Sequence, residues 1–223
     1  MQKLQDIRRQ RGWTQAELAT RLGVSQGYVA LLEQGRRDPS ASLRRRMVRV
    51  LDLPATMLAP TDGKTPTEAV LAADLANLGY PGFRHLRTVR ARRNPAAVLL
   101  DALAAERLEP RTAEALPWVL LTYPDLDWNW LLPRVKQADL QNRLGFVVSL
   151  ARTLAEQHEL PAAAGLRESE AGLERSRLVR EDVFGRSVLT EAERRWLRVN
   201  RPEAARHWNV LSDLRPEHLS HAV

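Results

Sequence analysis

The side chain best suited to specific recognition in this sequence is that of Gln26, which begins a short amphipathic segment. A glutamine amide forms two hydrogen bonds with the N6 and N7 atoms of adenine, and Leu31 or Ala30 can pack on a thymine methyl group. Side chains of these types can contact the edges of an A·T base pair. Helical spacing places on one outward face Gln26, Gly27, Ala30 and Leu31. The inward face comprises Val24, Val29 and Leu32.

Two helices joined by a sharp turn are needed to hold this face outward. Ala19 is small enough for the closest approach of the helices, and Gly23 adopts a left-handed turn conformation without a steric penalty. Thr14 and Ser25 precede the two helices as N-cap residues. The pattern therefore predicts a helix-turn-helix between about Gln15 and Gln34.

Further start and stop signals divide the first 58 residues into five short helices. Gly12 ends the first helix and Gly35 ends the third. Ser40 opens a fourth helix that runs to about Leu51, and a last turn follows Pro54. The fourth helix is expected to pack behind the reading helix with a solvated basic face, which comprises Arg44, Arg45, Arg46 and Arg49.

Residues 3–58 resemble the Cro/CI, or XRE-type, helix-turn-helix family. The resemblance rests on three short motifs, which are Thr14-Gln15, Gly23-Val24-Ser25 and Glu33-Gln34-Gly35. It implies a lambda-repressor-like, all-α fold and the binding of double-stranded DNA. It also implies a phosphate contact by Gln15 and a base contact by Gln26. A buried pair between Arg8 and Glu33 is implied as well.

The resemblance completes the candidate DNA-binding set. Gln34, Arg36 and Arg37 follow the reading helix and are implied to reach the DNA backbone. Tyr28 has two interpretations of equal weight, a phosphate contact or a prop against the second helix. Gly27 departs from the family pattern, in which a polar side chain is more usual, so base reading rests on few side chains. The full set is Gln15, Ser25, Gln26, Gly27, Tyr28, Ala30, Leu31, Gln34, Arg36 and Arg37.

Positive charge is concentrated in the first third of the chain. The formal net charge is +7, and 31 of the 34 basic residues are arginine, the side chain that forks onto phosphates and guanine edges. Residues 1–60 carry eleven basic and five acidic side chains, whereas residues 94–223 carry 17 and 19. A GC-rich genome accounts for the scarcity of lysine but not for this uneven distribution. Polyanions are therefore expected partners of the first third.

Other features of the composition exclude several classes of protein. The chain has no cysteine, which excludes disulfides, thiolate catalysis and cysteine-ligated metal sites. Its first residues lack the apolar core of a signal peptide, and no stretch approaches 18 apolar residues, so neither secretion nor membrane spanning is expected. A soluble, cytoplasmic protein is the expectation.

A short polar segment bracketed by prolines, residues 59–66, is predicted to link a domain of residues 1–58 to a larger domain of residues 67–223. Only helical periods occur beyond it, so the second domain is also expected to be all-α. The expected helices are Thr67–Leu78, Pro95–Glu106, Pro110–Leu121, Asp127–Lys136, Asp139–Gln157, Leu166–Arg180, Thr190–Val199 and Pro202–Leu211.

The expected helix at residues 139–157 is apolar almost all round, which is typical of a helix central to a core or an interface. We expect a homodimer assembled through the second domain, with this helix in the interface or directly beneath it. The tryptophans of this domain are expected as core anchors. They are Trp118, Trp128, Trp130, Trp196 and Trp208.

The basic stretch of residues 83–93 has two interpretations of nearly equal weight. Its five arginines can extend the surface that contacts DNA. Alternatively, the stretch is an amphipathic connector in which Phe83, Leu86 and Val89 pack inward while the arginines point to water.

Motifs for catalysis and cofactors are incomplete. Ala164-Gly165 resembles the cleavage dipeptide of self-cleaving repressors, but every lysine lies upstream of it, so the catalytic lysine of such proteases is missing. His158-Glu159 begins like a zincin motif, yet position 162 is alanine. The sequence has no G-x-G-x-x-G, Walker-type loop or nucleophile elbow. We therefore expect no enzyme activity, no cofactor and no metal.

Two functions remain open for the whole chain. The first is a transcription regulator, a repressor, whose second domain dimerises or senses a small-molecule effector. The second is an antitoxin-like regulator whose second domain binds a partner protein, the toxin. A third, an enzyme with a DNA-targeting head, lacks a motif to support it. The first two share DNA binding and differ only in the role of the second domain.

Overall fold

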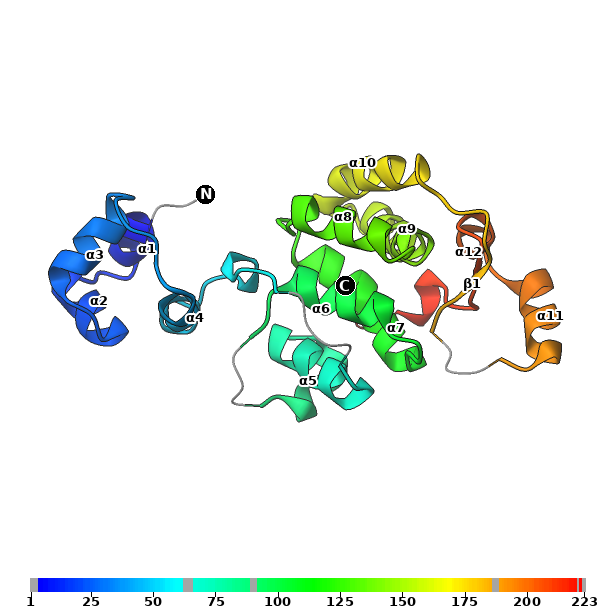
Figure 1. Ribbon diagram of the computed structural model, residues 1–223, viewed down its shortest axis with the longest axis horizontal. Helices are drawn as coiled ribbons and strands as arrows, with labels where there is room; N and C mark the ends of the chain where they lie inside the picture. Colours follow the sequence, from blue (N-terminus) through cyan, green and yellow to red (C-terminus); the bar gives the residue numbers. More distant parts are fainter. Residues whose placement is uncertain (1–3, 62–65, 89–91, 186–188, 220, 222–223) are drawn as a thin grey trace. The chain divides into compact units, whose positions relative to one another are not determined.

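Helices form almost all of the regular structure in a computed structural model of the chain, which describes residues 4–61, 66–88, 92–185, 189–219 and 221. The expected all-α fold is thus confirmed. The chain divides into two compact units, residues 1–59 and 60–223 (Figure 1). Of the predicted linker, residues 62–65 lie outside the described residues. No helix in the described ranges is long and apolar enough to cross a membrane.

In the described part of the first unit, residues 4–59, there are four short α-helices and a final 3-10 turn. The turn, η1, replaces the fifth helix that the sequence predicts, because only three residues follow Pro54 in helical geometry before the chain extends again at Leu58. The elements are α1 Leu4–Gln10, α2 Gln15–Leu22, α3 Gln26–Glu33, α4 Ala41–Val50 and η1 Ala55–Met57.

The helix ends of the first unit follow the predicted signals. Thr14 accepts a hydrogen bond from the backbone of Glu17 and forms a complete capping box with it. Gly23 has φ 61°, and Val24 N donates back to Ala19 O at 3.0 Å, which closes α2 in a Schellman turn. These local signals fix the angle at which α3 leaves α2.

The core of the first unit lies where the helices cross. Leu18, Leu22 and Val29 are fully buried, and α4 adds its apolar face behind them. Residues of α2 and α3 make direct contact along this core. The buried side chains of the cluster are Ile7, Leu18, Ala19, Leu22, Val29, Leu32, Leu43, Met47, Val48, Leu51, Leu53 and Leu58.

As far as the structure describes it, the second unit is a bundle of helices with one minimal parallel strand pair, Asp182–Val183 (β1) beside Val210–Leu211 (β2). Its first half comprises α5 Glu68–Leu78, η2 Pro81–Leu86, α6 Pro95–Ala104, α7 Pro110–Thr122 and α8 Trp128–Gln137. Its second half comprises α9 Gln141–Gln157, α10 Ala162–Glu174, β1, α11 Glu191–Asn200, α12 Glu203–His207, β2 and η3 Pro216–His218.

Two expected helices of the second unit are misplaced in the sequence prediction. The helix expected at Leu166–Arg180 begins at Ala162 and ends at Glu174. The helix expected at Pro202–Leu211 ends at His207, because Asn209 adopts a left-handed φ of 52° and Val210 then enters β2. Asparagine tolerates this conformation better than most residues, which makes it a helix terminator.

Helix α9 is the centre of the second unit. Most of its residues are buried within the same chain and only its last turn, with Glu156 and Gln157, is exposed, so α9 belongs to the core. Trp208 packs its ring over Gly145, and its indole nitrogen donates to Ser149 Oγ at 2.7 Å. Glu170 of α10 accepts from both Ser149 and Arg152, which ties α10 to α9.

The tryptophans of the second unit do not all serve as core anchors. Trp208 and Trp118 are buried as expected, and Trp128 and Trp130 are half-buried. The prediction that Trp196 is a core anchor is wrong, because 54% of its surface is exposed on α11. Its position on a peripheral helix is the physical reason, since only the opposite side of α11 faces the rest of the unit.

The basic stretch at residues 83–93 is partly used inside the second unit. Phe83 is buried, whereas Leu86 stays exposed, so only one of the expected inward residues in the described part packs inward. Arg87 donates to Ala76 O at 3.2 Å, and Arg93 bridges Asp74 and Asp101 at 2.8 and 2.6 Å. Val89 and Arg90 lie outside the described residues. At least two of the arginines thus have structural partners.

Candidate nucleic-acid interface

The outward face of α3 carries the predicted reading residues. Gln26 and Gly27 are exposed, and Ala30 and Leu31 are half-exposed, while Val29 on the other side is fully buried. A Cβ atom at Gly27 would meet nothing within 4 Å, so this position is open surface. The helix therefore presents a free side of the width that a major groove admits.

The start of α3 is fixed by its cap. Ser25 Oγ accepts a hydrogen bond from Tyr28 N at 3.2 Å. The Ser25 hydroxyl therefore serves as the N-cap of α3. Tyr28 is half-buried and packs against the core of the first unit, in line with its interpretation as a prop. Both residues therefore support the first turn of α3, in which Gln26 lies.

Gln15 has a second role that the sequence does not reveal. Its amide nitrogen donates to Glu33 Oε2 at 2.9 Å, which links the start of α2 to the end of α3. One amide hydrogen is therefore used inside the protein. The expected phosphate contact of Gln15 stays a prediction.

A buried ion pair supports the same junction. Arg8 Nε and Nη2 donate to the two carboxylate oxygens of Glu33 at 2.6 and 3.1 Å, and Arg8 Nη1 donates to Trp13 O at 2.7 Å. Only 3% of the Glu33 side chain is exposed. This is the pair that the resemblance implies. It fastens α1 to α3.

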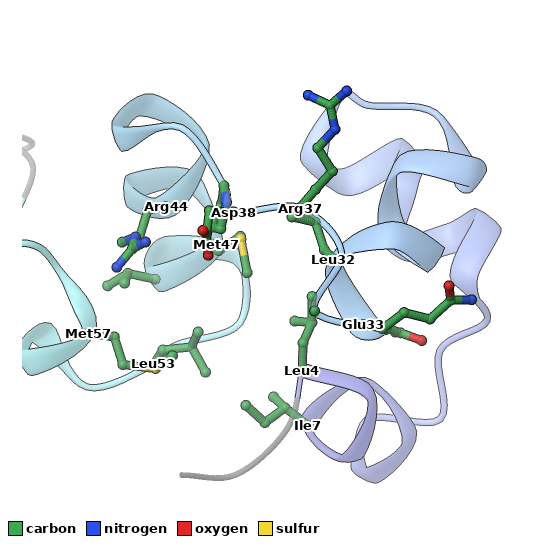
Figure 2. Close-up of a pocket in the computed structure, with 14 residues that line it drawn as sticks. Leu4, Ile7, Leu32, Glu33, Arg37, Asp38, Arg44, Met47, Leu53 and Met57 are labelled. Atoms are coloured by element: carbon green, nitrogen blue, oxygen red, sulfur yellow. The ribbon is translucent and has the colours of Figure 1, made fainter.

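The loop after α3 holds the remaining candidate residues, Gln34, Arg36 and Arg37, all of them exposed. Gly35 has φ 69°, and Arg36 N donates to Leu31 O at 2.9 Å, so the chain turns sharply away from α3. Figure 2 shows the guanidinium group of Arg37 pointing away from the apolar side chains beside it. These residues follow α3 directly in the chain and are exposed beside it.

Comparison with known proteins decides the family. The sequence model of the helix-turn-helix family matches residues 4–58. An uncharacterized HTH-type transcriptional regulator of Sinorhizobium fredii is 38% identical over 61 residues, which cover 27% of this chain and 78% of the relative. The chain belongs to the helix-turn-helix family. No solved structure matches it.

One arginine of α4 contributes to the helix-turn-helix motif directly, against expectation. Arg46 Nη1 donates to Leu22 O, the last carbonyl of α2, at 2.5 Å. The same nitrogen lies 2.8 Å from where a Cβ atom at Gly23 would be, so a side chain there would displace it. A cation at a helix C-terminus is favourable because it pairs with unpaired carbonyls. The contact joins residues 24 positions apart, and no local sequence signal indicates it.

Charge and packing are coupled at Glu33 in the helix-turn-helix unit. Burial by itself would raise the pKa of Glu33, but hydrogen bonds from Arg8 and Gln15 and the charges of Arg8 and Arg9 outweigh it. The pKa of Glu33 therefore lies below its ordinary value. The carboxylate stays ionised at neutral pH and can hold both α1 and α2 against α3.

A pocket of about 400 Å³ lies behind the reading helix of the helix-turn-helix unit (Figure 2). Side chains of α1, α3 and α4 line it, and it is mainly apolar. The residues lining it that Figure 2 labels are Leu4, Ile7, Leu32, Glu33, Arg37, Asp38, Arg44, Met47, Leu53 and Met57.

Proposed function

We propose that this chain, a DNA-binding transcriptional regulator, is a sequence-specific repressor that reads the major groove with α3. The observation that carries the proposal is the separation of the two faces of this helix. Gln26, with its hydrogen-bonding amide, is exposed, and Val29 is buried in the core. A helix held from behind with a free polar start is what base reading in the major groove requires.

The proposed contacts fall into two kinds. Gln26 reads a base edge, and Ala30 and Leu31 contact apolar base atoms such as a thymine methyl group. Gln15 and Arg36 bind phosphates on either side and set the register of the helix in the groove. Gln34 and Arg37 extend this backbone contact. Because Gly27 offers no side chain, Gln26 carries most of the hydrogen-bond readout.

Two reading heads are proposed to act together. A single head with few base contacts gives modest specificity, whereas a homodimer reads two half-sites about 34 Å, or roughly 10 base pairs, apart on one face of the duplex. The first unit is small and strongly basic, so we assign dimerisation to the second unit. A dimer that covers such an operator would block access of polymerase to an overlapping promoter.

Gln26→Ala is expected to lower the sequence specificity of DNA binding, whereas Arg36→Ala is expected to lower its affinity. Loss of Gln26 removes base readout and relaxes the preference at one position of each half-site, by about 1–3 kcal/mol of discrimination. Loss of Arg36 removes a phosphate contact and weakens binding evenly for all sequences. Binding selection from a randomised duplex library, with sequencing of the bound pool, measures both effects.

Arg107→Ala serves as the matched control for Arg36→Ala, because Arg107 is an exposed arginine of the second unit and its loss changes the net charge equally. It should leave the selected sequence and the affinity almost unchanged. Equal losses on every sequence for both Gln26→Ala and Arg36→Ala would show that α3 is not the reading helix.

The alternative, an antitoxin-like regulator, draws support from a second pocket. It measures about 480 Å³ and is lined by Tyr123 and Trp128 on one side and by Gly165, Ser169 and Gly172 of α10 on the other. Small side chains next to aromatic ones admit a helix or strand of a partner. Co-expression with the product of the neighbouring gene would favour this alternative if a stable stoichiometric complex formed through α10.

A further inference from the structure

The pocket of about 480 Å³ in the second unit, which lies between the end of α7, the start of α8 and α10, has the dimensions of a small-molecule site. Ligand pockets typically measure about 300–1,000 Å³ and combine apolar walls with a few polar groups. Leu120 and Leu166 contribute buried apolar side chains to its lining. Gly165 and Gly172 line it as well and are exposed, so a small molecule can enter from solvent.

Two aromatic residues line the pocket, and one of them has no partner ring or cation. Tyr123 is held in place, because its hydroxyl donates to Leu78 O at 2.6 Å. Trp128 is half-buried, and no ring or cation among the described residues packs against its indole. Its neighbour Trp130, in contrast, has the guanidinium carbon of Arg134 4.3 Å from its ring centroid. The Trp128 ring is therefore available to a ligand.

The charge of the pocket is negative. Of the described residues that line it, Glu168 alone is charged. The whole chain has more basic than acidic side chains, 34 against 27, so its composition does not predict a lining without a basic residue. Glu168 is exposed and forms no hydrogen bond or ion pair with the described part of the chain. An unpaired carboxylate thus lies at the same pocket as a free indole ring.

The start of α10 also borders the pocket, and a helix N-terminus generally attracts anions. Here this attraction is weak. Pro161 has no backbone N–H group, and Ala163 N donates to Leu160 O at 3.1 Å. Without a basic side chain in the described lining, the pocket offers an anion little compensation for the repulsion by Glu168.

We infer that this pocket binds a small lipophilic organic cation, such as a quaternary ammonium or phosphonium compound. The apolar groups of the ligand pack against Leu120 and Leu166, and its charge lies between the Trp128 ring and the Glu168 carboxylate. The face of an indole ring attracts cations more strongly than the other aromatic side chains do. A quaternary cation has no hydrogen-bond donor that the pocket must satisfy. The inference goes beyond the reading of DNA by α3 and does not depend on it.

Two probes of nearly the same shape and opposite charge test the inference. Tetraphenylphosphonium and tetraphenylborate are each titrated into the full chain, without DNA, in an isothermal titration calorimeter. Tetraphenylphosphonium should bind once per chain in the micromolar range. Tetraphenylborate should bind this site on the order of tenfold more weakly or less, because its charge is repelled by both the carboxylate and the ring face.

Gly165→Leu shows whether the cation binds in this pocket. A Cβ atom at Gly165 would meet nothing within 4 Å, and leucine favours a helix more than glycine does, so the side chain fills the pocket without disturbing α10. Binding of tetraphenylphosphonium should be lost, while the thermal unfolding temperature should not fall. Ala164→Leu is the matched control, because Ala164 is exposed on the same helix outside the pocket lining. It should bind the cation normally.

Two further variants test the ring and the carboxylate separately. Trp128→Leu keeps an apolar side chain but removes the ring, and should weaken cation binding by about 5- to 30-fold. Trp130→Leu, at a half-buried tryptophan outside the lining, should leave it unchanged. Glu168→Gln should weaken cation binding by up to about fivefold, as expected for an exposed charge. Glu106→Gln, at an exposed glutamate outside the lining, is its control.

Each contrary result overturns the inference. Absence of tetraphenylphosphonium binding, or undiminished binding in Gly165→Leu, would mean that the pocket is not a site for such a cation. Equal affinities for the two probes at a site that Gly165→Leu removes would mean that the ligand is chosen by shape and not by charge. A partner protein that binds α10 while neither probe binds would assign the pocket to that protein. DNA selection with the same samples is independent of these results, so loss of the cation site would leave the proposed repressor standing.

Discussion

Glu33→Ala is expected to destabilise the helix-turn-helix unit by about 3–5 kcal/mol, because removal of one partner leaves a buried charge unpaired. Arg8 loses both carboxylate contacts, and Gln15 loses its acceptor. A small domain has a total stability of about 5–15 kcal/mol. The variant should therefore unfold in much lower urea than the unmodified chain and lose DNA binding at moderate temperature.

Glu17→Ala is the matched control for this loss. Glu17 is an exposed glutamate of the same unit that closes the capping box of α2, and loss of a cap typically costs about 1 kcal/mol. Urea titration of both variants, followed by circular dichroism, compares them. A midpoint for Glu33→Ala no lower than that of Glu17→Ala would mean that the Arg8–Glu33 pair does not hold the unit together.

The same pair predicts an acid dependence. The pKa of Glu33 is lower in the folded state than in the unfolded chain, where it is about 4.3. The stabilisation is complete above that ordinary value and is lost as the pH falls through the lowered value of the folded state. The stability difference between the unmodified chain and Glu33→Ala should accordingly shrink at strongly acidic pH, and a difference that grows there would contradict this.

Gly145→Ala and Trp208→Ala change the two partners of one contact, and each is expected to lower the stability of the second unit. A Cβ atom at Gly145 would lie 2.3 Å from the Trp208 ring, so alanine forces the ring or α9 to move, at a cost of about 1–3 kcal/mol. Trp208→Ala leaves a cavity at the centre of the unit and removes the hydrogen bond that Ser149 Oγ accepts from the indole, at a cost of about 3–5 kcal/mol. Thermal unfolding of the second unit measures both.

The double variant and a glycine control make this prediction specific. In Gly145→Ala with Trp208→Ala, the added methyl group occupies space that the ring has left, so the combined loss should be clearly less than the sum. Gly172→Ala, on α10, meets nothing within 4 Å and should be neutral or slightly stabilising. If the stability losses of Gly145→Ala and Trp208→Ala simply add in the double variant, or if Gly172→Ala loses as much stability as Gly145→Ala, contact with the Trp208 ring is not the reason for a glycine at position 145.

Local signals made the helix-turn-helix unit readable from the sequence. Thr14, Gly23 and Ser25 each act within a few residues of themselves, as caps or as a left-handed turn, and the structure uses them in these roles. The alternation of inward and outward residues on α3 follows from helical geometry alone, so the burial of Val29 and the exposure of Gln26 were predictable. The all-α nature of the second unit followed from the same periodicity.

Contacts between distant residues were not readable. Arg46 on Leu22, Gln15 on Glu33 and Arg143 on Asp182 join side chains far apart in sequence, and a single sequence gives no sign of such pairs. The exposure of Trp196 could not be predicted from the sequence for a related reason. Amphipathic spacing shows that α11 has an apolar stripe, but only the packing of Leu197 shows which side the bundle covers.

The salt dependence of DNA binding tests the central claim that the first unit binds DNA through α3 and flanking phosphate contacts. The measurement is the affinity of the full chain for its selected operator across a range of salt concentrations, with Arg36→Ala alongside. The logarithm of the affinity should fall steeply and linearly with the logarithm of salt concentration, and the slope of Arg36→Ala should be less steep by about one unit per reading head. A flat response, or full affinity in a chain that lacks residues 1–60, would contradict the account.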